Sequence, residues 1–184
     1  MHQFIIFGPP GVGKGTQSEL IANTLNLFHL STGEYLRKAI NEESPLGIKA
    51  KEIVERGCLV PDNIMIGIVG EALKENLNGK DGFILDGFPR TIEQAKALDK
   101  IFAEMGYNNI IIISITAHDE EIINRLVKRG RKDDNVETIK LRLNIYEEST
   151  KPILDYYRNY KKIVEIDGVG EIEDINKILL KSIV

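Results

Sequence analysis

The sequence predicts an α/β fold in which helices cover both faces of a central parallel sheet, giving three αβα layers. Two observations lead to this fold class. Short apolar runs alternate with helix-like segments along the 184 residues, and a glycine-rich turn joins the first apolar run to the first helix. The length suits one domain with a small insertion. The predicted strands are residues 3–7, 82–85, 110–116 and 163–166, and a fifth, short strand ends at 29–30.

Local signals mark where helices begin and end. Residues 31–34 (Ser-Thr-Gly-Glu) and 91–94 (Thr-Ile-Glu-Gln) both fit a capping box, in which the first side chain caps the helix and the last reaches back to it. Ser44 precedes a proline at a first helical position, and Gly57 is a typical helix stop. Two short helices between 31 and 60, with no strand between them, predict a helical insertion that stands off the sheet.

Composition argues against several functional classes. The net charge of −4 does not favour a general binder of nucleic acid or of anionic membranes, because such proteins carry an excess of Lys and Arg. The single cysteine, Cys58, rules out an intramolecular disulfide and a four-cysteine structural zinc site, and it suits a reducing cytoplasm. The apolar run at 4–7 is too short to span a membrane and has no basic leader. We therefore expect a cytoplasmic protein.

Residues 8–16 carry the strongest chemical signal. The run Gly-Pro-Pro-Gly-Val-Gly-Lys-Gly-Thr follows a predicted strand and precedes a predicted helix, which is the context of a P-loop. Its glycines let successive backbone N–H groups surround a phosphate, while the helix N-terminus and Lys14 add positive charge. Gly15 departs from the common pattern, which has Ser or Thr directly after the lysine; here Thr16 comes one residue later. The segment predicts a P-loop NTPase fold.

Several motifs in order along the chain resemble one family. Gly-Lys-Gly-Thr at 13–16, joined with Asp-Gly-Phe-Pro-Arg at 86–90, resembles the nucleoside monophosphate kinases, and among them the adenylate kinases most closely. The resemblance covers nearly the whole chain and extends to 31–37, 59–60, 131–134 and Arg142. It implies the reversible reaction ATP + AMP = two ADP, with Mg²⁺ accompanying ATP, no structural zinc, and no nucleic-acid or membrane partner. It also implies a monomer with a central five-stranded sheet.

The resemblance also implies a division of the chain. The core P-loop domain would comprise 1–30, 61–127 and 135–184, and a helical NMP-binding insertion would comprise 31–60. A very short lid would span 128–134. Only three residues separate Arg129 from Asp133, so this lid can be little more than a turn.

Site roles follow from the same resemblance. The ATP-binding residues would be Gly11, Val12, Gly13, Lys14, Gly15, Thr16, Arg125, Arg129 and Gly170. The AMP-binding residues would be Thr32, Arg37, Cys58, Leu59, Val60, Gly87, Phe88, Pro89, Arg90, Gln94, Arg131 and Arg142. The catalytic residues would be Lys14, Arg90, Arg125, Arg131 and Arg142. Arginine suits these roles because its planar guanidinium meets phosphate oxygens bidentately, and phosphoryl transfer needs aligned charge rather than an enzyme nucleophile.

One carboxylate is the candidate metal contact. Asp86 follows a predicted apolar strand, so it should lie at the carboxyl edge of the sheet, where open α/β sheets bind ligands. There it would hold Mg²⁺ through water, since magnesium keeps most of its hydration shell.

Two positions favour AMP as the acceptor. Thr32 and Gln94 match the adenylate kinases, whereas UMP/CMP kinases usually carry Ala and Asn there. An amide can both donate to and accept from an adenine edge, but Gln94 also completes the Thr91 capping box. A UMP/CMP kinase is therefore the first alternative. A P-loop ATPase or regulatory switch is the second, although the guanine-reading Asn-Lys-x-Asp of switch GTPases does not occur.

Overall fold

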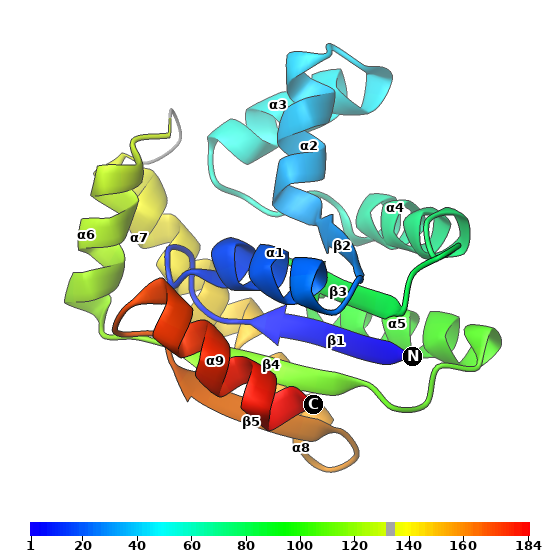
Figure 1. Cartoon of the computed structure of the whole chain (residues 1–184). Coiled ribbons are helices and arrows are strands. Elements are labelled where there is room, and N and C mark those ends of the chain that lie inside the picture. The colour runs from blue at the N-terminus through cyan, green and yellow to red at the C-terminus, as the bar shows by residue number, and fades with distance from the viewer. Residues whose placement is uncertain (132–134) are drawn as a thin grey trace.

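The computed structural model describes residues 1–131 and 135–184, so three residues of the predicted lid (132–134) lie outside the described part of the chain. Five parallel strands form one sheet in the order β2-β3-β1-β4-β5 (Figure 1). They are β1 (His2–Phe7), β2 (Phe28–Ser31), β3 (Gly82–Asp86), β4 (Ile111–Thr116) and β5 (Lys162–Asp167). The predicted α/β class and its five-stranded parallel sheet are confirmed.

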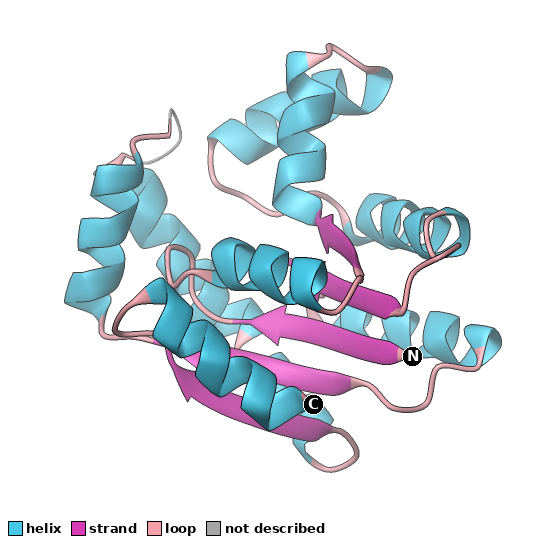
Figure 2. Cartoon of the chain, in the orientation of Figure 1, coloured by secondary structure: helices cyan, strands magenta, loops and turns pink. Residues whose placement is uncertain are grey.

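The strands alternate with helices, as Figure 2 shows. The helices are α1 (Lys14–Thr24), α2 (Thr32–Asn41), α3 (Pro45–Glu55), α4 (Asp62–Glu75), α5 (Ile92–Met105), α6 (Asp119–Arg129), α7 (Val136–Ile145), α8 (Pro152–Arg158) and α9 (Ile172–Ile183). A π-helical turn, Tyr146–Thr150, joins α7 to α8.

Helices cover the sheet on both faces, with α1 and α9 on one side and α4, α5 and α8 on the other (Figure 1). The side chains of β1 explain this arrangement, because successive residues of a strand point to opposite faces. Phe4 and Ile6 pack in a core with residues of α1 and α9, whereas Ile5 and Phe7 pack with residues of α4, α5 and α8. A strand buried on both faces reads as the continuous apolar run seen in the sequence.

The carboxyl ends of three strands meet at one edge of the sheet. In the strand register, Asp86 at the end of β3 lies opposite Ser31 of β2 and Ile6 of β1. The P-loop leaves β1 and α2 leaves β2 at this same edge, and α2 and α3 rise above it as a separate pair (Figure 1). This edge is where a ligand of an open α/β sheet is expected.

The predicted helix caps have mixed outcomes. Ser44 and Thr91 cap their helices, accepting from the N–H groups of Gly47 (3.1 Å) and Gln94 (3.2 Å). The prediction for Ser31 is wrong, because its side chain makes no capping hydrogen bond. Ser31 ends β2 and its ladder with β3 leaves it a ψ of 103°, whereas the two serine and threonine caps that form have ψ near 158°. Pairing with β3 therefore gives Ser31 a different backbone conformation from the residues that do cap their helices.

Over the described ranges, no helix has both the length and the apolar character that crossing a bilayer would require.

Candidate active site

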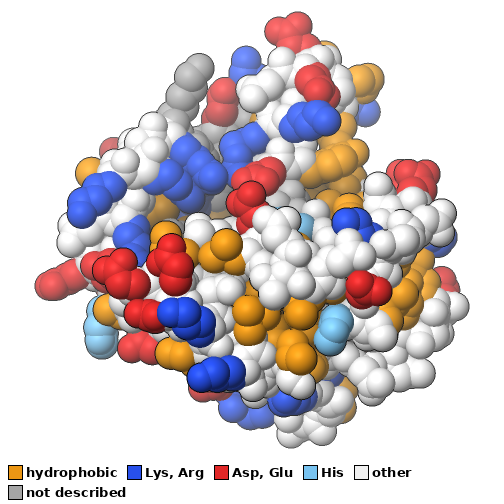
Figure 3. Space-filling view, viewed as in Figure 1, with side chains coloured by type: hydrophobic (Ala, Val, Ile, Leu, Met, Phe, Trp, Pro, Cys, Tyr) orange, Lys and Arg blue, Asp and Glu red, His pale blue; other side chains and the backbone are white. Residues whose placement is uncertain are grey.

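A single continuous cleft of about 1020 Å³ lies along the carboxyl edge of the sheet. It is bounded by the P-loop, by α2 and the end of α3, by the β3–α5 connection, and by α6 and α7. Figure 3 shows Lys and Arg side chains gathered in the hollow between the α2–α3 pair and the α6–α7 pair. Its volume lies just above the usual ~300–1,000 Å³ range for pockets that hold one ligand, so the cleft has room for more than one small ligand.

The P-loop wraps the N-terminus of α1. Gly13 caps this helix at a φ of +105°, a left-handed conformation that glycine adopts without strain, and Lys14 is the first helical residue. The first N–H groups of a helix have no acceptor within it, so those of α1 are directed at the cleft and suit an anion. The Lys14 ammonium donates to the carbonyl oxygens of Gly8 (2.8 Å) and Pro9 (3.0 Å), and so lies across the loop.

The charge state of Lys14 depends on its surroundings. Burial lowers the pKa of its ammonium from 10.5 to about 8, the Asp86 carboxylate opposes this change, and Arg90 and Arg129 add to it. Lysine, unlike arginine, can lose its proton under such conditions. A phosphate group placed at this loop would raise the pKa again, because an opposite charge favours the protonated form.

Asp86 fits the expected contact for a hydrated cation. It is only 8% exposed and ends β3 beside the P-loop, where a Cβ on Gly15 would lie 3.5 Å from its Oδ2. The glycine that departs from the usual P-loop pattern thus leaves space next to this carboxylate. Among residues 1–131 and 135–184 there is no cluster of three or more His, Cys, Asp or Glu side chains that could enclose a metal. A single carboxylate suits Mg²⁺, which takes its remaining ligands from water and substrate phosphates.

Arg125 ties two loops together at the donor end. Its guanidinium donates to the carbonyl oxygens of Val12 (3.2 Å) in the P-loop and Gly168 (3.0 Å) after β5, and it pairs with Glu121 at 2.6 Å. Arg129 projects from the same face of α6 and lines the same cleft, as its spacing in the sequence predicts.

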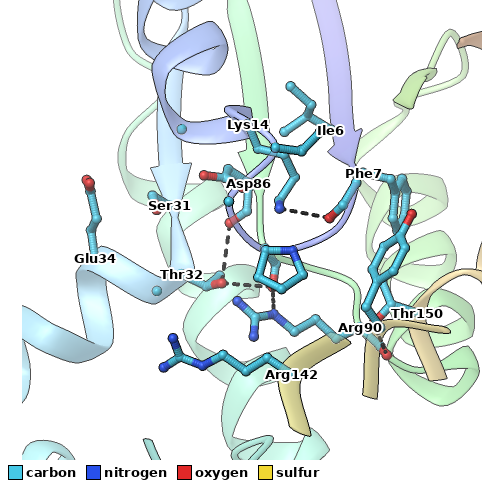
Figure 4. Close-up of a pocket in the computed structure, with 18 of the residues that line it drawn as sticks. Ile6, Phe7, Lys14, Ser31, Thr32, Glu34, Asp86, Arg90, Arg142 and Thr150 are labelled. Atoms are coloured by element: carbon cyan, nitrogen blue, oxygen red, sulfur yellow. Dashed lines mark hydrogen bonds between the residues drawn. The ribbon is translucent and has the colours of Figure 1, made fainter. Parts of the chain in front are cut away.

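Arg90 is held at the centre of the cleft. Its Nε donates to the carbonyl oxygen of Gly87 (2.8 Å), and its own carbonyl accepts from the hydroxyl of Thr150 (3.1 Å). Burial lowers the pKa of its guanidinium, as does Arg142, while Asp86 opposes the change. Figure 4 shows Lys14 and Arg90 approaching the space beside Asp86 from opposite sides, with Arg142 next to Arg90.

Thr32 and Gly87 form the adjoining wall. Thr32 is buried, and its hydroxyl lies 2.9 Å from the carbonyl oxygen of Gly87 and 3.3 Å from that of Asp86 (Figure 4). Gly87 has a φ of +80°, and a Cβ on it would lie 2.8 Å from the Thr32 hydroxyl and 3.0 Å from the Arg90 guanidinium. Only glycine fits this position, because any side chain would be strained and would also push both neighbours away.

Gln94 is 1% exposed, yet it lines the cleft. Its Oε1 accepts from the backbone N–H of Arg90 (2.7 Å), one residue before the Thr91 N–H that a capping box would use. Its Nε2 donates to Asp62 (2.8 Å). Half of the predicted capping box is therefore replaced by a tertiary contact, because the buried amide finds a carboxylate from α4.

The structure brings almost every predicted site residue to this one cleft. Those that line it are Gly11, Val12, Gly13, Lys14, Gly15, Thr16, Thr32, Arg37, Cys58, Leu59, Val60, Asp86, Gly87, Pro89, Arg90, Gln94, Arg125, Arg129, Arg131, Arg142 and Gly170. Phe88 does not line the cleft: its ring is 1% exposed and packs in the apolar core, where burial of an aromatic ring is favourable, so its predicted contact with the acceptor stays a prediction.

Sequence reasoning missed two supporting residues. Thr150 holds the backbone of Arg90, and Asp62 accepts from both Thr91 and Gln94. Asp62 lies 32 residues from Gln94 and Thr150 lies 60 from Arg90, so no local pattern links them. The only available signal was the acidic residue directly after Pro61 at the start of a helix, which is also a common arrangement without function.

Comparison with known proteins agrees with this geometry. Residues 6–162 match the family model described as adenylate kinase. The chain is 44% identical over 187 residues to an adenylate kinase of Leptospira biflexa, with 100% of both chains covered. It is 43% identical to adenylate kinase 1 of a Nostoc species, with 95% of each chain covered, and 40% identical to an adenylate kinase of Corynebacterium glutamicum, with 98% of each covered. The chain therefore belongs to the adenylate kinase family.

Proposed function

We propose that this protein transfers the terminal phosphoryl group of ATP to AMP, reversibly, giving two ADP. One observation carries the proposal: the P-loop and the Thr32–Gly87–Arg90–Gln94 wall line one continuous cleft, with Lys14 and Arg90 both beside Asp86. An ATPase would need the first wall only. Two nucleotides placed end to end in this cleft would bring donor and acceptor phosphates together between these cations.

The donor would lie along the P-loop. The N–H groups at the start of α1 and the Lys14 ammonium would bind its β- and γ-phosphates. Arg125 and Arg129 on α6 would contact the donor phosphates from the other side, and Gly170 would lie near the base. The bonds of Arg125 to Val12 and Gly168 favour this role, because they hold its guanidinium in place before the donor arrives.

The acceptor would lie against α2, α3 and the β3–α5 connection. Arg37, Arg90, Arg131 and Arg142 would hold its phosphate, and Thr32 and Gln94 would face its base. Leu59, Val60 and Pro89 would line the adjoining wall, with Cys58 at its exposed rim. The insertion that contributes Arg37 would be residues 31–60, the core 1–30, 61–127 and 135–184, and the lid 128–134.

The chemistry would need no enzyme nucleophile. An oxygen of the acceptor phosphate forms a bond to the γ-phosphorus, and the bond between that phosphorus and the β–γ bridging oxygen breaks, leaving two diphosphates. Lys14, Arg90, Arg125, Arg131 and Arg142 would neutralise the charge that spreads over the transferred group. Mg²⁺, held through water by Asp86, would supply further positive charge on the donor phosphates.

The test is an acceptor panel. ADP formation would be measured with MgATP and AMP, dAMP, UMP, CMP or GMP, and ATP loss without any acceptor would be measured alongside. We expect the highest kcat/KM with AMP. A preference for UMP or CMP would instead support the pyrimidine-nucleotide kinase, and ATP loss that is independent of acceptor would support an ATPase.

We further propose a monomer acting in the cytoplasm. Both walls of the cleft come from one chain, so no second copy is needed to complete the site. The one cysteine is an exposed free thiol, which suits a reducing compartment. Sedimentation at several protein concentrations would test the first statement, and fractionation of the source cells the second.

A further inference from the structure

Asp62 lies at the end of a chain of hydrogen bonds that reaches the acceptor wall. It is the first residue of α4, and each of its carboxylate oxygens has a partner. Oδ1 accepts from Gln94 Nε2 at 2.8 Å, and Oδ2 accepts from the Thr91 hydroxyl at 2.9 Å. The first turn of a helix favours a negative charge. Asp62 is therefore suited to act as an ionised group that only accepts.

This acceptor determines which way round the Gln94 amide lies. An ionised carboxylate has no proton to donate, so the Gln94 atom that faces it must be the amide nitrogen. On the other side, the backbone N–H of Arg90 can only donate, so the atom that faces it must be the amide oxygen. Both neighbours require the same orientation. A flipped amide would lose two hydrogen bonds and create two repulsive contacts in a buried place, where each unsatisfied polar group costs ~1–3 kcal/mol.

Thr91 is oriented in the same way. Its hydroxyl proton is directed to Asp62, which leaves a lone pair to accept from the backbone N–H of Gln94 at 3.2 Å. One carboxylate on α4, that of Asp62, therefore orients both the capping residue of α5 and the Gln94 side chain that α5 carries into the cleft. The same Arg90 whose N–H meets Gln94 also holds Gly87 with its guanidinium, so base and phosphate contacts share this network.

A fixed amide presents a fixed pattern to the acceptor base. With one N–H and one lone pair used inside the protein, Gln94 retains one donor and one acceptor, in a set order, toward the cleft that it lines. An aminopurine offers an acceptor at N1 and a donor at N6, which complements this order. An oxopurine offers a donor at N1 and an acceptor at O6, which is the reverse.

We propose that Asp62 is a positioning residue that selects aminopurine over oxopurine acceptors by fixing the orientation of the Gln94 amide. This inference rests on the proposed AMP kinase activity and adds to it a residue that contacts neither nucleotide. Sites built around buried hydrogen bonds reject mismatched substrates strongly, whereas an amide free to flip serves both patterns.

The test compares kcat/KM for AMP and for inosine monophosphate in three proteins. In Asp62→Asn, the side chain can turn either a donor or an acceptor toward Gln94, so one of the two constraints on the amide is removed and only the Arg90 N–H still opposes a flip. We expect the AMP-to-inosine-monophosphate ratio to fall at least ~10-fold, mainly through a higher KM for AMP, with kcat nearly unchanged. An unchanged ratio would overturn the proposal.

Asp99→Asn is the matched control. Asp99 is also a partly buried aspartate with several donors, accepting from Tyr156 (3.0 Å) and Tyr160 (3.1 Å) and pairing with Lys161 (3.0 Å), but unlike Gln94, the partner of Asp62, none of these residues lines the cleft. Its loss should lower stability and leave the nucleotide ratio as it is. A fall in the ratio equal to that of Asp62→Asn would mean that general loosening, not amide orientation, is measured.

Two outcomes separate this inference from the function on which it rests. Wild-type protein that fails to phosphorylate AMP would refute the function, whereas active wild type with an unaltered ratio in Asp62→Asn would refute only the role of Asp62. Should Asp62→Asn not fold, a crystal structure of the wild-type protein with AMP decides the matter. We expect adenine N6 against Gln94 Oε1 and N1 against Nε2; the reverse placement, or a base that does not reach Gln94, would overturn the proposal.

Discussion

The two ends of the cleft hold their side chains in different ways. At the donor end, Lys14 and Arg125 bind backbone carbonyl oxygens of the P-loop and of the loop after β5. At the acceptor end, the contacts are mostly between side chains or to the β3–α5 turn, as with Gln94 and Asp62. Backbone that leaves a buried sheet has little freedom, so the donor end is largely preformed.

The acceptor end also depends on a less firmly packed element. Of the residues of α2 and α3, the buried apolar ones are Leu36, Ala39 and Ala50, while Tyr35 and Ile48 are exposed. The sheet beneath the P-loop, in contrast, has strand residues such as Ile5 and Ile113 that are fully buried. Substitutions at the donor end should therefore reduce catalysis without loss of fold, and those at the acceptor end should act on acceptor affinity.

The largest effect is expected for Lys14→Ala. Removing the ammonium should lower kcat at least ~10³-fold, about 4 kcal/mol, because its charge is needed where the transferred group becomes negative. The thermal midpoint should change little, since the ammonium is already destabilised by burial. Steady-state kinetics and thermal melts measure the two quantities. Lys96→Ala, at an exposed lysine paired with Glu93, is the control and should have no effect on kcat.

Arg90→Ala should have the next largest effect and should distinguish the two ends. We expect kcat/KM for AMP to fall ~10²-fold or more, with a much smaller change in KM for ATP, because the guanidinium also holds Gly87 in the acceptor wall. The control is Arg158→Ala, an exposed arginine paired with Asp155 and Glu165. Equal losses for both nucleotides would remove the distinction between the ends.

The pH dependence of ATP binding should be smaller and confined to the donor end. The Lys14 pKa is about 8 without nucleotide, and bound phosphates raise it. ATP affinity is then complete below about pH 8 and decreases as the pH rises further, by up to about tenfold per pH unit. Titration calorimetry with MgATP across this range measures it. In Lys14→Arg the decrease should vanish, since arginine keeps its proton; an unaltered decrease would assign it to another group.

The smallest effect should be protection of Cys58. This thiol is exposed at the acceptor rim of the cleft and belongs to the only cysteine in the sequence. A chromogenic thiol reagent therefore reports on this position alone. AMP should slow its reaction a few-fold, whereas MgATP alone should not. If MgATP slowed the reaction and AMP did not, the donor and acceptor ends of the cleft would have to be assigned the other way round.

Some features could be predicted because they depend on neighbours in the chain. The P-loop, the strand before it, and the position of Asp86 at the end of β3 follow from periodicity and from glycines at fixed spacing. The caps at Ser44 and Thr91 are local too. Ser31 has the same sequence signature as Thr91, yet it does not cap its helix, because pairing between β2 and β3 sets its backbone.

The sequence by itself determined the fold class and the phosphate loop, since each depends on hydrophobic alternation or on backbone geometry within a few residues. The set of basic site residues came from the resemblance of its motifs to a known family. Tertiary structure alone decided which of the site's side chains are buried and which of their polar atoms form hydrogen bonds within the protein. The burial of Phe88, the hold of Thr150 on Arg90 and the orientation of the Gln94 amide by Asp62 all join segments far apart in the chain. A buried polar group must find a partner wherever packing brings one, and packing is a property of the whole fold.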